Sequence, residues 1–226
     1  MLCLKSSSEV FLFAMLVGMS HDVKVVASAL AIGLTLVAYV PYIIDMFRGK
    51  NKPHLYTWIS IFLVTAIVAY LQIIGGAGIG AVPVVLGVGV DVIILFYCFK
   101  FGTKDVVFMD KVCLALSIIG VVAYVLFTKH PVVSLAIVSI AEVIAFIPTV
   151  RKTRNDPYSE SLPSYYLLII KLSLIAVALQ HYNWLTLSYP VMWIGVFVIF
   201  LVAVFRWRTQ KAPKKHEPQP EAAPLI

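Results

Sequence analysis

The chain has 226 residues, of which 61% are hydrophobic and 13% are charged, with a mean hydropathy of +0.96 and a formal net charge of +7. Soluble domains contain about 45–50% apolar and about 25% charged residues, so this composition excludes a soluble domain, a disordered chain and a nucleic-acid-binding protein. It predicts an all-α integral membrane protein that crosses the bilayer several times, with lipid as its main surroundings.

A helix crosses the bilayer core with roughly 20 apolar residues. Seven segments approach or reach that length and predict transmembrane helices: 25–46, 55–74, 80–99, 112–127, 132–150, 162–179 and 185–205. The apolar run 10–19 is too short to span and has the form of a signal-peptide core, so residues 1–23 are predicted to be an N-terminal extension. The polar, proline-rich residues 209–226 are predicted to be a disordered cytoplasmic tail.

The basic residues predict the orientation of these helices. Most of the 18 Lys and Arg residues lie in the loops after the first, third and fifth segments and in the tail, and the opposite side holds only Lys5, Lys24 and Lys129. Because Lys and Arg collect in cytoplasmic loops, we expect the N-terminus outside and the C-terminus in the cytoplasm. The expected location is the cell membrane, either plasma or inner.

The chain also shows an internal repeat at one constant offset. Pro41 falls on Pro148, and Leu55 falls on Leu162, so that the first three predicted helices fall on the last three. Because a single helix is left between them, both triplets start on the same side of the membrane. The sequence therefore predicts two parallel triple-helix repeats, 24–100 and 131–208, with a linker helix within 101–130. A chance alignment of prolines near helix ends is the alternative.

This 3+1+3 arrangement, with a proline near the cytoplasmic end of the first helix of each repeat, resembles the PQ-loop and SWEET transporter clan. Pro41-Tyr42 and Pro148-Thr149 precede basic loops, as a Pro-Gln pair does in the clan, and Tyr and Thr stand here in place of Gln. Lys-Pro-His and Ile-Pro-Thr strings are shared with a group of bacterial integral membrane proteins that the chain also resembles. The resemblance implies a transporter of small polar solutes that works by alternating access, with proton coupling as an option.

Three charged residues lie near the middle of predicted spans: Asp91, Glu142 and Lys171. Each would cost about 2.5–3.5 kcal/mol if it faced lipid, so we expect them to face the bundle interior and to form a central site for solute or proton. A Glu142–Lys171 ion pair that only joins two helices is the structural alternative. Asp91 has no assigned cation, which suits it to carrying a proton or to contacting a cationic or hydroxylated substrate. A hydrogen bond to backbone freed at Gly87 or Gly89 is its structural alternative.

Further residues are expected around this site. Tyr39, Thr35 and Trp193 are candidate lining residues that would contact the solute, and Thr65, Gln72 and Gln180 are further candidates. Pro41 and Pro148 each remove one backbone hydrogen bond from a helix, which predicts matched hinges at the cytoplasmic halves of the two repeats. A static kink at each proline is the alternative.

Motifs for catalysis or cofactor binding are missing from the sequence. It contains no Walker loop, no dinucleotide-binding glycine pattern and no metalloprotease helix motif, and its three cysteines and five histidines are too scattered for a metal site. We therefore expect no enzymatic activity, no cofactor and no bound metal. The segment 75–78 predicts a tight, flexible turn. The rival function is a ligand-recognising receptor or structural membrane protein on the same scaffold, and a homo-oligomer is compatible with either function.

Overall fold

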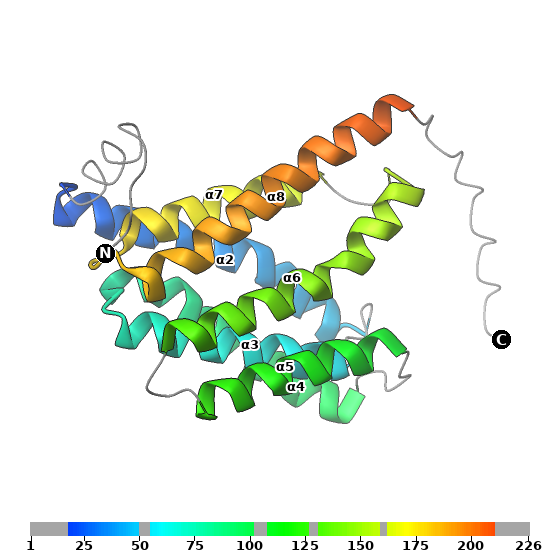
Figure 1. The fold of residues 1–226 in the computed structure, drawn as a ribbon, viewed down its shortest axis with the longest axis horizontal. Helices are drawn as coiled ribbons and strands as arrows, with labels where there is room; N and C mark the ends of the chain where they lie inside the picture. The colour runs from blue at the N-terminus through cyan, green and yellow to red at the C-terminus, as the bar shows by residue number, and fades with distance from the viewer. Residues whose placement is uncertain (1–17, 50–54, 102–107, 127–130, 159–161, 211–226) are drawn as a thin grey trace.

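The computed structural model describes residues 18–49, 55–101, 108–126, 131–158 and 162–210 (Figure 1). Within these ranges the chain is entirely helical and forms no β-strand. The described elements are α2 (His21–Phe47), α3 (Leu55–Ile74), the 3-10 helix η1 (Gly78–Ala81), α4 (Val82–Phe101), α5 (Phe108–Leu126), α6 (Pro131–Asn155), α7 (Leu162–Ala178) and α8 (Trp184–Gln210). Each of the seven predicted segments overlaps one α-helix. The predicted extension up to residue 17 and the tail from residue 211 lie outside the described residues.

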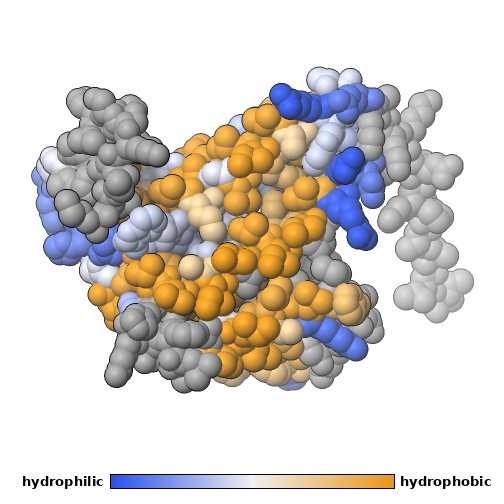
Figure 2. Space-filling model, in the orientation of Figure 1, coloured by the Kyte–Doolittle hydropathy of each residue, from blue (hydrophilic) through white to orange (hydrophobic). Residues whose placement is uncertain are grey.

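Four helical stretches are long and apolar enough to cross a membrane among the described residues: α2, η1 with α4, α6 and α8. Their outward faces carry large apolar side chains, for example Val37, Phe96 and Ile199, which are 67%, 75% and 72% exposed. Figure 2 shows such side chains as a broad apolar surface between two more polar ends. Water-soluble proteins rarely expose apolar area on this scale. The fold is therefore that of an all-α membrane protein.

The helices are arranged in a bundle in which neighbours in the sequence are not always neighbours in space (Figure 1). In the first half, which consists of α2, α3 and α4, α4 packs against both other helices. In the second half, which consists of α6, α7 and α8, α8 packs in the same way against both α6 and α7. The halves meet where α2 lies along α7, and α5 packs against both α3 and α6. The third helix of each half is thus the central one.

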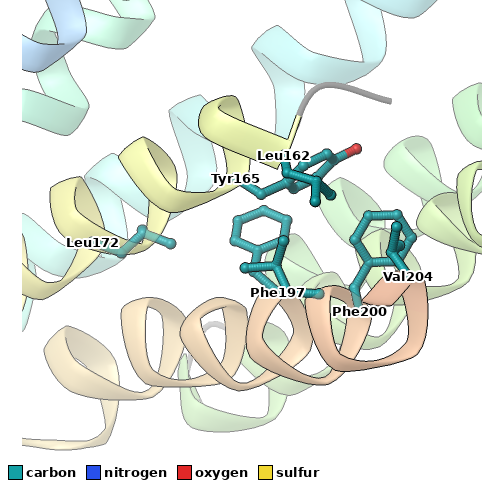
Figure 3. Close-up of a cluster of buried hydrophobic side chains, with 7 residues drawn as sticks. Leu162, Tyr165, Leu172, Phe197, Phe200 and Val204 are labelled. Atoms are coloured by element: carbon teal, nitrogen blue, oxygen red, sulfur yellow. The ribbon is translucent and has the colours of Figure 1, made fainter. Parts of the chain in front are cut away.

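Each half has its own apolar cluster toward the end of the bundle where α2, α4, α6 and α8 finish. Between α7 and α8, Tyr165 packs on Phe197 and Phe200 with ring centroids 5.6 Å and 4.9 Å apart (Figure 3). In the first half, Met46, Leu55, Val90, Ile94 and Cys98 form the corresponding cluster, with aromatic side chains packed around it. Aromatic pairs of this kind add specific packing to simple burial.

At the opposite end, the turn that contains Gly75–Gly78 is bound to the turn between α7 and α8. Backbone N–H groups of Gln180 and His181 donate to the carbonyls of Ala77 and Gly76 at 3.0 Å and 3.2 Å. Asn183 caps α8 by accepting from Leu185 N–H at 2.9 Å, and its Nδ2 donates to the Gly75 carbonyl at 2.6 Å. The sequence predicts a tight, flexible turn here. The structure shows that a second turn binds its carbonyl groups, and its flexibility stays a prediction.

Glycine is required where these two turns meet. Gly76 and Gly78 have φ angles of 79° and 58°, in the left-handed region that glycine adopts without steric cost. Gly80 approaches the end of α7 so closely that a Cβ atom would lie 2.8 Å from the Leu179 nitrogen. Burial raises the pKa of the nearby Tyr182 hydroxyl, which donates to the Val177 carbonyl at 3.1 Å. The two halves are therefore packed backbone against backbone at this end.

Candidate functional site

A cavity of about 250 Å³ lies in the middle of the bundle, between helices from both halves. Its walls come from α2, α3 and α4 on one side and from α7 and α8 on the other. The lining residues are Tyr39, Thr65, Pro83, Val84, Gly87, Leu168, Lys171, Leu172, Ile175, Tyr189, Trp193 and Phe197. Leu172 and Phe197 also belong to the α7–α8 cluster of Figure 3, so the cavity adjoins that cluster.

Among the described residues that line the cavity, Lys171 is the charged one. It lies halfway along α7 and interacts electrostatically with Asp91 on α4. The Asp91 side chain is 1% exposed. The Thr65 hydroxyl lies beside it but donates to the Ile61 carbonyl at 2.8 Å, and neither Asp91 oxygen accepts a hydrogen bond from any described residue. Asp91 is therefore a buried carboxylate behind the cavity wall that has a nearby cation but no hydrogen-bond donor.

Glu142 on α6 has a different environment. Its two oxygens accept hydrogen bonds from α8, from the Tyr189 hydroxyl at 3.3 Å and from Trp193 Nε1 at 3.0 Å. Both donors line the cavity with their rings. Glu142 is not itself a lining residue, and instead holds two aromatic rings of the wall from behind.

The expected Glu142–Lys171 ion pair is not present among the described residues. Lys171 interacts with Asp91, and Glu142 interacts with Tyr189 and Trp193. In the second half, α8 packs against both α6 and α7, and its Tyr189 and Trp193 side chains are the ones that bind Glu142. Two residues at the same depth on α6 and α7 can therefore have different partners.

The polar side chains around the cavity lie near one another. Tyr39 on α2 lies near Asp91, and Tyr189 on α8 lies near Tyr39 and donates to Glu142. Asp91, Tyr39, Tyr189 and Glu142 thus connect the α4 side of the cavity with the α6 side. The three charged residues predicted from their depth are all brought to this one region, with Lys171 in the wall and the two carboxylates behind it.

Other predicted residues lie elsewhere. Thr35 is fully buried, donates to the Ala31 carbonyl at 2.8 Å, and is not in the cavity wall. Gln72 is also fully buried, and its side-chain amide makes no hydrogen bond to the described residues. Gln180 is exposed in the turn before α8. Of the further candidates, Thr65 alone lines the cavity.

The two predicted hinge prolines both lie inside helices. Pro41 is an exposed residue within α2, six positions before its end at Phe47. Pro148 lies at the corresponding part of α6, and its side chain is outside the described structure. The contacts of Pro41 do not show whether α2 bends at this residue when the protein changes conformation, so the hinge role stays a prediction.

Tyr189 was missed by the sequence reasoning. A signal for it was present, because Tyr189, Trp193 and Phe197 are spaced four residues apart and therefore share one face of a helix. All three line the cavity. Trp193 stacks on Phe197 with ring centroids 5.0 Å apart, so this face forms a continuous aromatic wall.

Within the described part of the chain, no group of three or more His, Cys, Asp or Glu side chains could hold a metal ion. Comparisons of the chain with protein-family models, curated proteins and solved structures returned no match. The likeness to the PQ-loop and SWEET clan therefore stays a prediction from the sequence.

Proposed function

We propose that this chain is a PQ-loop or SWEET-like transporter that moves a small polar solute across a membrane by alternating access. The observation that carries the proposal is the cavity of about 250 Å³, which is lined from both halves of the bundle and has a charged residue in its wall. Transporters built from repeats bind their substrates near the bilayer midplane, at the interface between the repeats.

The helix packing supports the repeat on which this mechanism depends. In each half, the third helix packs against both the first and the second. In the proposed architecture, α2, α3 and α4 form the first triple-helix repeat, α5 is the linker helix, and α6, α7 and α8 form the second. All seven helices would span the membrane. Rocking of one triplet against the other, with Pro41 and Pro148 as hinges, would expose the cavity to each side in turn.

The two ends of the bundle provide the gates in this scheme. One gate is the packed pair of turns in which Asn183 Nδ2 donates to the Gly75 carbonyl at 2.6 Å. The other is formed by the two apolar clusters at the opposite end. Opening either gate alone would connect the cavity to one side of the membrane only, as alternating access requires.

The charge distribution supports an orientation. The end where α2, α4, α6 and α8 finish carries Arg48, Lys100, Arg151, Arg154, Arg206 and Arg208. Arg208 Nε donates to the Pro157 carbonyl at 2.8 Å, which ties α8 to the loop after α6. We place this basic end in the cytoplasm of a plasma or inner membrane. A reporter fused after Arg208 should be cytoplasmic and one inserted at Gly78 external; both on one side would remove the seven-span arrangement.

Solute flux decides between transport and the rival receptor role. Purified protein would be reconstituted into liposomes and supplied with radiolabelled sugars, amino acids, nucleosides and carboxylates. Net uptake of at least one class above protein-free vesicles is expected. Binding of a solute without any movement across the membrane would contradict transport and favour a ligand-recognising receptor.

A further inference from the structure

Some hydrogen-bond donors of the cavity wall are bonded to other protein groups and some are not, and this difference restricts which ligands can bind. Trp193 Nε1 and the Tyr189 hydroxyl both donate to Glu142, at 3.0 Å and 3.3 Å. The Thr65 hydroxyl donates to the Ile61 carbonyl at 2.8 Å. The donor hydrogens of three polar lining groups are therefore already used in hydrogen bonds within the protein.

Two donor groups remain for a ligand within the described wall. The Lys171 ammonium and the Tyr39 hydroxyl line the cavity, and neither makes a hydrogen bond to a described residue. An ammonium group offers three donor hydrogens and no acceptor. Apart from the Thr65 hydroxyl, the rest of the described wall is apolar or aromatic. The cavity thus combines one concentrated, positively charged donor site with a large apolar surface.

This combination fits an anion with an apolar body. A carboxylate accepts hydrogen bonds without donating any, and charge-assisted bonds to it are the strong ones. A sugar would present several hydroxyl donors around its ring, and the side-chain acceptors of the described wall are three hydroxyl oxygens, those of Tyr39, Thr65 and Tyr189. Sugar hydroxyls beyond these would be buried without an acceptor, which is costly for a polar group. The volume equals that of roughly eight water molecules at about 30 Å³ each, which fits a small solute.

Resting on the transport function proposed above, we infer that the solute is a small monocarboxylate. Its carboxylate binds Lys171 Nζ, with the Tyr39 hydroxyl as a second donor, and its apolar body packs against the aromatic wall of Tyr189, Trp193 and Phe197. Asp91 lies close enough to Lys171 to interact with it electrostatically. Glu142 contributes indirectly, because it accepts the hydrogen bonds that the Tyr189 hydroxyl and Trp193 Nε1 would otherwise offer to a ligand.

Charge balance follows from this arrangement. A bound carboxylate would leave two anions, its own and that of Asp91, beside one ammonium. Uptake of one proton by Asp91 restores the net charge that the site has without solute, so the carboxylate and a proton would move together. The other titratable groups facing this region are Tyr39 from α2 and Tyr189 from α8, with Glu142 behind Tyr189 on α6.

The first test measures binding to the purified full-length protein. The probes are acetate, pyruvate, 2-oxoisocaproate, benzoate, phenylpyruvate and indole-3-acetate, each beside its neutral primary amide, together with glucose, alanine and choline. We expect at least one of these carboxylates to raise the melting temperature and to bind at least tenfold more tightly than its amide by titration calorimetry. Tighter binding of an uncharged or cationic probe, or no stabilisation by any carboxylate, would overturn the inference.

Variants assign the binding to Lys171. Lys171→Met should weaken carboxylate binding at least tenfold, and Lys171→Arg should retain it. Lys24→Met is the matched control, because Lys24 is a buried lysine outside the cavity that lies 4.8 Å from the centre of the Tyr182 ring. If Lys171→Met does not fold, Lys171→Met combined with Asp91→Asn removes both charges and should fold without binding carboxylate. Equal losses in the Lys24 and Lys171 variants would contradict the assignment.

Flux measurements separate this inference from the proposed function. A carboxylate that binds through Lys171 but does not cross the membrane of proteoliposomes would support the carboxylate site and reject transport. A sugar or amino acid that is transported, with no carboxylate binding, would support transport and reject the carboxylate site.

Discussion

The two halves of the bundle pack in the same way but hold their buried carboxylates differently. Asp91 lies on the central helix of the first half and accepts no hydrogen bond from the described residues. Glu142 lies on the first helix of the second half and accepts two, both from α8. Similar helix packing therefore surrounds two acids with opposite hydrogen-bonding states.

The difference indicates two roles for a charge at the same depth. A carboxylate with both oxygens bound to neighbouring donors is part of the packing, because its loss leaves those donors unsatisfied. A buried carboxylate without donors has no such structural function, and groups of this kind call for a functional explanation. We therefore expect Asp91 to take part in the transport cycle and Glu142 to hold the aromatic wall.

The largest expected effect is on gradient-driven transport by Asp91→Asn. Asparagine cannot take up or release a proton, so accumulation driven by a pH gradient should fall to the level of protein-free vesicles. Exchange without a gradient should continue once the flux is corrected for the amount of folded protein. That correction is needed because Asp91→Asn leaves Lys171 without its nearby carboxylate. Full accumulation in response to an imposed pH gradient would reject the proton-carrying role of Asp91.

Glu142→Gln, measured in the same vesicles, tests whether the two acids really differ. After correction for the amount of folded protein, this variant should still respond to the pH gradient. If it loses the response as completely as Asp91→Asn does, the distinction between a transporting and a packing carboxylate fails.

The next effect concerns the stability of the Asp91–Lys171 pair. Lys171→Met leaves Asp91 buried without its cation, which is expected to lower the free energy of unfolding by about 3–5 kcal/mol. Adding Asp91→Asn should restore much of that loss. Thermal unfolding of the two single variants and the double variant checks this, and additive losses would show that the residues are not coupled.

A smaller loss is expected when Glu142 is removed. Glu142→Leu leaves the Tyr189 hydroxyl and Trp193 Nε1 without their acceptor, at a cost of about 2 kcal/mol. Tyr189→Phe in the same chain removes one of those donors and should recover part of the stability. No recovery in the double variant, measured by thermal unfolding, would mean that the Tyr189 hydrogen bond does not contribute.

The smallest effect is expected where the two halves meet. Gly80→Ala would place a Cβ atom 2.8 Å from the Leu179 nitrogen and 2.9 Å from the Ala178 carbonyl carbon, so backbone must move, at about 1–2 kcal/mol. Gly89→Ala is the matched control, because a Cβ there meets nothing within 4 Å and alanine favours the helix. Equal melting temperatures for the two variants would show that the close approach has no energetic role.

The sequence by itself determined the helices and the depth of the polar residues. Long apolar runs predict helices because only an internally hydrogen-bonded backbone is stable in lipid, and each predicted segment overlaps a helix, with α3 beginning at Leu55 as expected. The high cost of charge in lipid likewise predicted that Asp91, Glu142 and Lys171 lie in the interior, and all three lie at or behind the cavity wall.

The tertiary structure alone decided which of these residues meet. Depth along a helix does not give its neighbours: Lys171 on α7 interacts with Asp91 on α4, and Glu142 on α6 is bound by Tyr189 and Trp193 on α8. Thr35 shows the same limit, because its side chain donates within its own helix at 2.8 Å. The hydrogen-bond partners of a buried group depend on helix order and rotation, which the packing of the whole bundle sets.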